Sequence, residues 1–508
     1  MDDRMADYLA VLENSAAETP DHPALIDEGG TVGYRDMMTE VGRRADVLVR
    51  AGMVPRQRVA LVAENSARFL ISALAVWKAG GALVTIYPSS AKDDLSYSIA
   101  SADPALVLVD RVSAPAVADA LTDHRPTAMI DGEDFTVNSV RADTAPSPDH
   151  VRARLRLITY SSGTTNRPKA IMVSDVALLN GAETFTSVWH LGREDRTVVA
   201  LPMAWLFGLA STSMATLYAG GTVIALRRSR PQMILDAIAD HRGTFLGGVT
   251  TMFTKLVRHL DTTVDKPDMS SLRLCVSGGE ARNDAAFDRW ASHTSVSVLD
   301  NYCATECFPL VTYDPTVDPT PVRGAAGTVV PTNEFRVVDD EGREVERGMV
   351  GEAQGRGPGL MLGYWDDPTT TAEAMVDGWY RMRDLVRVDE RGYVHVVGRL
   401  SDMIIRGGSN ISPAEVERVL HCHASVRAVA VVGLPDEIYG QKVVAAVVLA
   451  DGAALDADAL GTFAAEQLAS FKVPTEYVVL DALPQNTTSG KVDRRAVTAL
   501  LAAPSARS

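Results

Sequence analysis

Residues 58–88 decide the fold class, and they read RVALVAENSARFLISALAVWKAGGALVTIYP. Both ends of this stretch are short apolar runs with β-branched residues, which favour buried strands. Residues 66–81 between them have the apolar spacing and the terminal glycines of a helix. Similar strand-like runs recur at residues 101–110 and 222–228. Strands that alternate with helices predict an α/β fold with parallel sheets covered by helices.

The size and the charge of the chain limit its class. It has 508 residues, which exceeds the size at which one hydrophobic core stops growing, so we expect two or more domains. Hydrophobic residues make up 46% and charged residues 22%, which is an ordinary globular balance. The formal net charge of -16 argues against nucleic acid or an anionic membrane as a partner.

Cysteine usage and the N-terminus bear on the compartment. The chain has 4 cysteines, too few for a disulfide framework at this length. No histidine–cysteine cluster has the spacing of a zinc site. The sequence opens with MDDRMADYLA, which lacks the apolar core of a signal peptide. We therefore expect a reduced, cytoplasmic protein.

One uncharged segment, residues 197–226, is long enough in principle to cross a membrane. It contains Pro202, Gly208 and the pair Gly220–Gly221, together with many serines and threonines. This composition predicts a strand, a loop, a buried helix and a second strand inside a globular core.

The sequence pattern changes near residue 405. Residues 412–420 begin with the Ser–Pro signal of a helix N-terminus. Residues 426–436 and 442–450 predict strands, and residues 456–471 predict a helix. Together they predict a compact C-terminal domain of roughly a hundred residues. In the larger part, the Pro-, Asp- and Ser-rich residues 136–150 predict a surface connection.

A loop rich in hydroxyl groups follows an apolar run at residues 155–158. Residues 159–170 read TYSSGTTNRPKA, with Lys169 near the end. The Walker A order of glycines and lysine is missing. Backbone N–H groups and hydroxyls can still surround a polyphosphate. The same composition also occurs in ordinary Ser/Thr turns, so the loop alone leaves both interpretations open.

Three further stretches can serve a nucleotide. NYCATE at residues 301–306 combines an aromatic ring, a hydroxyl and a carboxylate, and Glu306 can hold Mg²⁺ through water. GWYRMRDL supplies Asp384, and VVGRLSD supplies Arg399. Near the C-terminus, Lys491 follows a Ser–Gly turn.

In this order the stretches resemble the adenylate-forming superfamily, which includes acyl-CoA synthetases, the adenylation domains of peptide synthetases, and luciferase. The resemblance covers nearly the whole chain, from PDHPALID at residue 20 to SGKVDRR at residue 495. The matching blocks between them include SGGEAR at 277–282 and GPGLMLGYWDDPTTTAEAMVDGWY at 357–380.

The resemblance implies a reaction in two steps. A carboxylic acid and ATP form an acyl-adenylate and pyrophosphate, and a thiol then displaces AMP. The thiol belongs to coenzyme A or to the phosphopantetheine arm of an acyl carrier protein. Mg²⁺ accompanies the ATP. The protein contributes mainly positioning and charge stabilisation.

The resemblance also assigns roles to single positions. Lys491, Thr305, Glu306 and Lys169 match residues of the chemical step, and Glu306 matches the magnesium ligand. The positions that match nucleotide-binding residues are Ser161, Ser162, Gly163, Thr164, Thr165, Gly278, Gly279, Glu280, Tyr302, Asp384 and Arg399. The positions that match the acyl pocket are Trp205, Leu206, Phe207, Gly248, Val249, Asn301, Cys303, Pro309 and Leu310. In the family, the residue at Tyr302 stacks on adenine and the residue at Asp384 binds the ribose hydroxyls.

Several positions depart from the family pattern near the substrates. Asn166 stands where the phosphate loop normally has Gly, and Asn tolerates a left-handed conformation, so the shape of the loop should be kept. Cys303 replaces a usual Gly and should narrow the acyl pocket, or it fills a gap as a small apolar residue. Trp205 replaces the His of acyl-CoA synthetases, and Leu206 stands where amino-acid-activating domains have Asp.

Other departures lie near the domain boundary. Arg383 and Met382 replace the usual Gly and Thr before the ribose-binding acid. Ser401 stands at the hinge position, where the family has Asp or Lys, and Asp402 follows it. These changes bear on domain closure and remove no catalytic group.

We expect an N-terminal nucleotide-binding domain over residues 1–398, a hinge at 399–402 and a mobile C-terminal domain over 403–508. Rotation on the hinge would bring Lys491 in for adenylation and the loop at 406–408 in for thiol transfer. The pocket composition predicts a small, largely uncharged acid, aromatic or short aliphatic, which is passed to coenzyme A.

Three alternatives stay open. The enzyme can load a carrier protein instead of coenzyme A. It can keep the adenylating chemistry but form an amide or activate an unusual acid such as nitrite. Trp205 leaves room for this, because it replaces the residue that controls thiol entry in the family. It can bind a nucleotide without turnover, although the presence of Lys491, Glu306 and Asp384 together argues against this. ATP–pyrophosphate exchange separates a mere binder from an enzyme.

Overall fold

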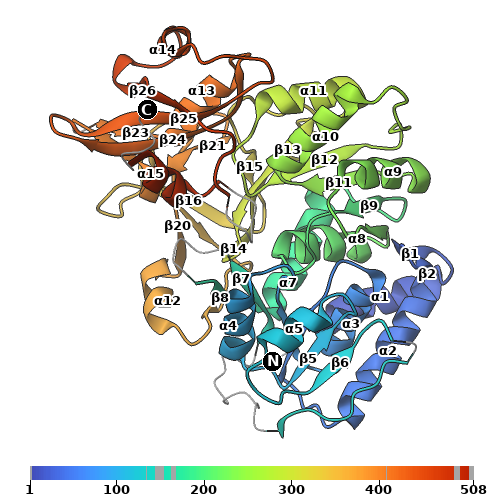
Figure 1. The fold of residues 1–508 in the computed structure, drawn as a ribbon. Helices are drawn as coiled ribbons and strands as arrows, with labels where there is room; N and C mark the ends of the chain where they lie inside the picture. The colour runs from blue at the N-terminus through green and yellow to red at the C-terminus, as the bar shows by residue number, and fades with distance from the viewer. Residues whose placement is uncertain are drawn as a thin grey trace.

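The computed structural model describes residues 3–132, 134–142, 154–161, 167–407, 409–485 and 492–502. Within these ranges the chain forms an α/β assembly (Figure 1). Two large sheets with surrounding helices make up most of the N-terminal part, and a smaller α+β unit, orange to red, follows at the C-terminus. The predicted fold class is confirmed.

The first large sheet has the strand order β18-β8-β7-β4-β3-β5-β6. Its strands are β3 (Arg58–Val62), β4 (Ala82–Thr85), β5 (Leu106–Val109), β6 (Thr127–Met129), β7 (Leu155–Ser161), β8 (Lys169–Ser174) and β18 (Gly363–Tyr364). The strands from β7 to β6 are parallel, and the edge formed by β7, β8 and β18 is antiparallel.

The stretch at residues 58–88 folds as its sequence predicts. β3 and β4 are buried along their whole length, because helices cover both faces of a parallel sheet. Helix α3 (Ala67–Lys78) connects them and is itself almost entirely buried. The Ser66 side chain caps this helix by accepting a hydrogen bond from the Phe69 N–H.

The second large sheet has the strand order β15-β14-β13-β12-β11-β9-β10-β1-β2. Its strands are β1 (Pro23–Asp27), β2 (Gly30–Gly33), β9 (Arg196–Val199), β10 (Thr222–Ala225), β11 (Phe245–Gly248), β12 (Leu274–Gly278), β13 (Val298–Ala304), β14 (Cys307–Thr312) and β15 (Thr328–Val329). The strands from β13 to β1 are parallel, and both edges are antiparallel.

Helices cover both sheets. They are α1 (Arg4–Glu18), α2 (Tyr34–Arg50), α4 (Lys92–Ala102), α5 (Ala114–Ala120), α7 (Asp175–Val188), α8 (Ala215–Tyr218), α9 (Pro231–His241), α10 (Thr250–Thr262), α11 (Asp284–Thr294) and α12 (Pro368–Ala374), besides α3. Helices α9, α10 and α11 lie beside the second sheet (Figure 1). Their apolar side chains pack against those of its strands.

The uncharged segment at residues 197–226 lies in the core, as predicted. It runs through β9, a loop, a π-helix at Phe207–Met214, then α8 and β10. Its serines and threonines bond inside the fold: Ser213 and Thr212 donate to the carbonyl of Gly208. No helix of the described ranges is long and apolar enough to span a membrane.

A third sheet leads toward the C-terminus. It pairs β16 (Glu334–Val338), β17 (Gly351–Arg356), β20 (Trp379–Val388) and β19 (Met375–Val376), and β21 (Val394–Arg399) pairs with β20. The register of β20 and β21 places Asp384 opposite Arg399.

The C-terminal unit matches its predicted elements with one correction. Its strands are β22 (Ile404–Arg406), β23 (Ser409–Ile411), β24 (Val426–Asp436), β25 (Gly440–Leu449) and β26 (Glu476–Val479), and its helices are α13 (Pro413–His421), α14 (Ala457–Ala465) and α15 (Arg494–Ala502). The helix predicted to reach Phe471 ends at Ala465. The chain turns there, so that Leu468 packs into the core of this unit while Phe471 stays exposed.

A short 3-10 turn, Leu400–Asp402, lies between β21 and β22 and overlaps the predicted hinge. The Ser412 hydroxyl donates to the Val397 carbonyl, and Arg494 pairs with Asp402 at 3.3 Å. These contacts fasten the C-terminal unit to the third sheet, while the boundaries at 398 and 402 stay a prediction. Of the predicted surface connection, residues 136–142 lack strand and α-helix, and residues 143–150 lie outside the described residues.

Candidate active site

The predicted phosphate loop joins two antiparallel strands. β7 ends at Ser161 and β8 begins at Lys169, and these two residues face each other in the ladder. Ser162, Gly163, Thr164, Thr165 and Asn166 lie outside the described residues. The structure therefore shows how the loop is anchored at both ends.

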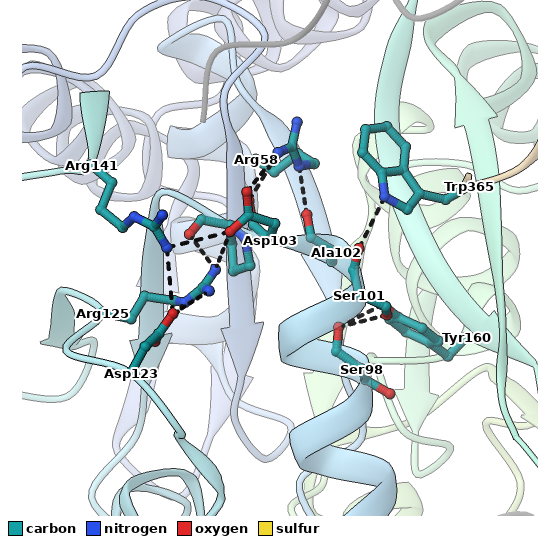
Figure 2. Close-up of polar contacts among 11 residues, drawn as sticks. Arg58, Ser98, Ser101, Ala102, Asp103, Asp123, Arg125, Arg141, Tyr160 and Trp365 are labelled. Carbon is teal, nitrogen blue, oxygen red and sulfur yellow. Dashed lines mark hydrogen bonds and ion pairs between the residues drawn. The ribbon is translucent and has the colours of Figure 1, made fainter. Parts of the chain in front are cut away.

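Helix α4 holds the loop's incoming strand (Figure 2). The Tyr160 hydroxyl lies 2.6 Å from the Ser98 carbonyl and 2.9 Å from the Ser101 hydroxyl. The Trp365 indole N–H donates to the Ser101 carbonyl at 3.0 Å, and the Trp365 backbone N–H donates to Ala170 of β8 at 2.9 Å. Both strands that flank the loop are thereby tied to the end of one helix.

Arginines support the same helix end (Figure 2). The Arg58 side chain donates to the Ala102 carbonyl at 2.6 Å and to the Asp103 carbonyl at 2.9 Å. Arg125 pairs with the Asp103 carboxylate at 3.1 Å. The last carbonyls of a helix have no partner inside it, and cations satisfy them here.

Lys169 and Glu306 meet at the ring of Tyr364. The Lys169 ammonium nitrogen lies 5.2 Å from the centroid of this ring. The Tyr364 hydroxyl donates to a Glu306 carboxylate oxygen at 2.9 Å. Burial raises the pKa of Glu306, while the hydrogen bond from Tyr364 and the charge of Lys169 oppose the shift. Tyr380 lies beside them, and burial and Glu306 raise the pKa of its phenol.

Tyr302, Asp384 and Arg399 form a second group. The Tyr302 hydroxyl donates to one oxygen of the buried Asp384 carboxylate at 2.9 Å. The other oxygen lies 3.4 Å from Arg399 Nε, across the β20–β21 ladder. Burial, and then Asp384, raise the pKa of the Tyr302 phenol, so it stays protonated and remains a donor. Thr305 lies half-buried in the turn that follows β13.

The C-terminal end of β12 lies beside β13, with Gly278 opposite Asn301. A Cβ at Gly278 would lie 2.8 Å from the Asn301 carbonyl oxygen and 3.2 Å from a ring carbon of Phe207, so only Gly fits there. Gly279 has a positive φ of 80°. The Glu280 carboxylate accepts hydrogen bonds from the backbone N–H and the hydroxyl of Thr251, and it thus caps the start of α10.

The predicted acyl-pocket residues fall into two sets. Phe207, Asn301 and Gly278 lie together, and Trp205 lies nearby on the same segment, with its ring centroid 5.4 Å from that of Tyr87. The remaining positions are packed among other core residues. Leu206 is buried, Leu310 lies against Gly355, Gly248 lies against Met252, Val249 precedes α10, and the Pro309 carbonyl accepts from Asn333.

Two polar groups of β13 face inward. The side-chain oxygen of Asn301 is buried and has no hydrogen-bond partner among the described residues. Burial raises the pKa of the Cys303 thiol to about 12, so it stays protonated at neutral pH. This protonation favours the interpretation of Cys303 as a small space-filling residue over a nucleophile.

Comparison with known proteins identifies the fold. Residues 12–365 match the AMP-binding enzyme family, and residues 415–491 match the AMP-binding enzyme C-terminal domain. The chain belongs to the AMP-binding enzymes. It is thus a member of the adenylate-forming superfamily, as the sequence motifs indicate.

Named members of the AMP-binding enzymes align over almost the full length. Feruloyl-CoA synthase from an Amycolatopsis species is 33% identical over 93% of this chain and 94% of that protein. ATP-bound MatB from Rhodopseudomonas palustris is 31% identical, with a TM-score of 0.84 over 96% of this chain and 98% of that one. The amide bond synthetase McbA from Marinactinospora thermotolerans is 28% identical, with a TM-score of 0.86 over 97% and 99% of the two chains.

The residues of this AMP-binding enzyme can accommodate Mg²⁺ on ATP. In the described ranges no group of three or more His, Cys, Asp or Glu side chains could form a metal cage by itself. Mg²⁺ usually takes one or two carboxylates and completes its shell with phosphates and water. Glu306 offers one such carboxylate, and it shares the neighbour Tyr364 with Lys169 at the start of β8.

Sequence reasoning assigned no role to Tyr364, Tyr380 and Tyr87. Both Tyr364 and Tyr380 lie within the quoted stretch 357–380, but no local pattern shows that their side chains approach Glu306. Lys491, the predicted mobile lysine, and Gly408 of the predicted thiol-transfer loop lie outside the described residues.

Proposed function

We propose that this enzyme activates a small carboxylic acid, aromatic or short aliphatic, as its acyl-adenylate and passes the acyl group to coenzyme A. The observation that carries the proposal is the meeting of the Tyr302–Asp384 pair and the Glu306–Tyr364–Lys169 group at the end of β13, beside the predicted acyl-pocket residues Gly278 and Asn301. The Tyr302–Asp384 pair is suited to bind adenosine, and the Glu306–Tyr364–Lys169 group is suited to bind polyphosphate and its metal ion. The acid would bind beside the predicted acyl-pocket residues.

In the first step, a carboxylate oxygen attacks the α-phosphorus of ATP and the bond to the β-phosphate oxygen breaks. Pyrophosphate leaves. Asp384 holds the ribose hydroxyls, and Tyr302 lies against adenine. Lys169 and Lys491 neutralise charge between anions that must approach each other. Glu306 would hold Mg²⁺, which supplies further charge neutralisation on the phosphates.

In the second step, the thiol sulfur attacks the acyl carbon and AMP leaves with the bonding electron pair. We propose that the C-terminal unit turns about residues 399–402 between the steps and presents residues 406–408 to the thiol. In the described structure the Arg406 side chain donates to the Phe471 carbonyl at 2.8 Å, and Gly407 has a φ of 56°.

The proposed size of the acid is supported by the packing of the predicted pocket residues. Phe207 lies against Gly278, and the rings of Trp205 and Tyr87 pack together. The Cys303 side chain replaces a hydrogen atom of the usual Gly. The buried Asn301 oxygen lies in the same region and suits an acid that carries a hydrogen-bond donor.

Amide formation is a second candidate, because the McbA amide bond synthetase matches this fold with a TM-score of 0.86. Both candidates share the acyl-adenylate. The deciding experiment is ATP–pyrophosphate exchange over a panel of acids, followed by mass spectrometry of products formed with coenzyme A, carrier protein or amines. If no acid of the panel supports exchange, the adenylating function is contradicted. An amide product would favour the second candidate.

A further inference from the structure

Arg383 has an unusual backbone for its place in the fold. Its φ is 56°, in the left-handed region that favours glycine. The other non-glycine residues with such angles in the described ranges lie in turns or at helix ends. Arg383 lies inside strand β20, directly before Asp384. Strained backbone of this kind gathers at functional sites, where the surrounding structure holds it.

Arg383 lies in a bulge of β20. Ala353 of β17 faces the three residues 382–384, because the register between the strands shifts there. Bulges are common next to active sites, where they interrupt the regular pairing of strands. Here Met382 and Asp384 turn into the protein, and Arg383 is exposed.

The Arg383 guanidinium forms no hydrogen bond or ion pair with the residues that the structure describes. The neighbouring arginines do form such contacts: Arg381 pairs with Glu352 at 2.6 Å, and Arg399 lies 3.4 Å from Asp384. The donors of Arg383 are therefore available to a bound anion. A glycine, which the family usually has here, could offer none.

The charge of Arg383 acts on the phosphate side of the site. Burial and the Glu306 carboxylate raise the pKa of the Tyr364 phenol, and the positive charge of Arg383 works in the opposite direction. Tyr364 donates to Glu306 and lies under the Lys169 ammonium group. Arg383 therefore lies within electrostatic reach of Tyr364, which contacts the two residues that the proposed function assigns to metal and phosphate.

We propose that Arg383 is a phosphate-binding residue that contacts the β- or γ-phosphate of bound ATP. Its planar guanidinium can donate two parallel N–H···O bonds to phosphate oxygens, and it keeps its charge at all working pH values. The same contact would persist on the departing pyrophosphate. The inference rests on the proposed function, and it adds a cation at a position where the family has no side chain.

The test is calorimetric titration of the full-length enzyme with ATP and, separately, with AMP. Arg383→Met is expected to raise the Kd for ATP about tenfold and to leave the Kd for AMP within about twofold, because one charge-assisted contact is worth roughly a factor of ten. Arg383→Asn tolerates the same backbone angle and should lose the same affinity without lowering the melting temperature. Arg387→Met, in the same strand, is the matched control and should bind both nucleotides normally.

The possible results distinguish the inference about Arg383 from the proposed function. If both Arg383 variants bind ATP within twofold of wild type, the inference is wrong and the proposed function stands. An equal loss of ATP and AMP affinity also overturns it, since Arg383 would then only support the ribose site. Normal ATP binding with a raised KM for coenzyme A would assign the cation to the acceptor and overturn it as well. A wild-type enzyme that binds no ATP would overturn both the inference and the proposed function.

Discussion

The Tyr302 hydroxyl donates to the Asp384 carboxylate at 2.9 Å, although the two residues lie 82 positions apart in the sequence. The bond connects strand β13 of the second sheet to strand β20 of the third. It fixes one oxygen of a buried carboxylate, and Arg399 lies near the other. If Asp384 binds ribose as proposed, its carboxylate is oriented before the nucleotide arrives, which lowers the entropy cost of binding.

Asp384→Ala should weaken ATP binding and raise the KM for ATP by tenfold or more. Each hydrogen bond to a charged acceptor contributes about 1.5–3 kcal/mol in difference measurements. Steady-state pyrophosphate exchange at varied ATP measures the effect. Tyr302→Phe should have a smaller effect, because it removes the orienting donor but keeps the ring and the carboxylate. A KM and a turnover near wild type for Asp384→Ala would contradict the assignment.

Lys491→Ala should sharply lower adenylate formation and spare thiol transfer from a pre-made acyl-adenylate. Losing one well-placed electrostatic contact costs about 3 kcal/mol, which is about a hundredfold in rate. The two half-reactions are measured separately, by exchange and by release of AMP. Lys472→Ala is the control: this lysine of the C-terminal unit pairs with Glu415 at 2.7 Å and should keep both activities. Unchanged exchange in Lys491→Ala would reject the role.

Protonation of Glu306 should set a lower pH limit for adenylation. Burial raises its pKa, so the ionised form that meets Mg²⁺ is lost at a higher pH than for an ordinary glutamate, near 4.3. Exchange activity should therefore rise with pH through this raised pKa, and more Mg²⁺ should move the limit to lower pH. Tyr364→Phe should move the limit upward, because it removes a hydrogen bond that favours the ionised form. Glu306→Gln should be slow and lack this limit, and an unchanged profile would contradict the assignment.

The four cysteines should differ in reactivity. Cys422 is exposed, whereas Cys275 and Cys307 are buried and Cys303 is half-buried. Burial raises the pKa of Cys275 and of Cys303 to about 12, and thiols with such a pKa are poor nucleophiles at neutral pH. A thiol reagent at pH 8 should label one cysteine quickly in the folded enzyme and all of them after unfolding. Fast labelling of Cys303, found by peptide mapping, would revive its interpretation as a reactive residue.

The fold was largely predictable because its signals are local. The strand–helix–strand pattern at residues 58–88 appears in the sequence, since buried parallel strands need continuous apolar runs. The helix predicted at 456–471 was too long, because the burial of Leu468 in the C-terminal core turns the chain after Ala465. Helical propensity alone does not encode that tertiary contact.

The site was predictable only through its motifs. Tyr302, Glu306 and Asp384 were predicted as site residues because each lies in a motif of the family. Tyr364 was missed because its role depends on a contact with Glu306, 58 positions away. The departure at Arg383 was visible in the sequence, but its left-handed backbone inside a strand was not.

Leu206 bears on the class of acid. An enzyme that selects a free amino acid must desolvate an ammonium group, which costs several kcal/mol without a partner carboxylate. Amino-acid-activating relatives have Asp at this position. Here Leu206 is buried and apolar, and Phe207 follows it and lies against Gly278. The acid of β13 nearest in sequence to Asn301, Asp300, is already paired with Arg282 at 2.5 Å.

We therefore expect α-amino acids to be poor substrates, and acids without a charged amine near the carboxylate to be good ones. Matched pairs test this directly, with phenylalanine against phenylpropanoic or cinnamic acid in the same exchange assay. The acid without the amine should exchange at least tenfold faster, since even about 1.4 kcal/mol of uncompensated desolvation gives that ratio. Leu206→Asp should narrow or reverse the preference, because it supplies the missing partner. If the amino acid is clearly faster with the wild-type enzyme, an acid elsewhere in the pocket serves the amine, and the interpretation of Leu206 is wrong while the adenylating chemistry stands.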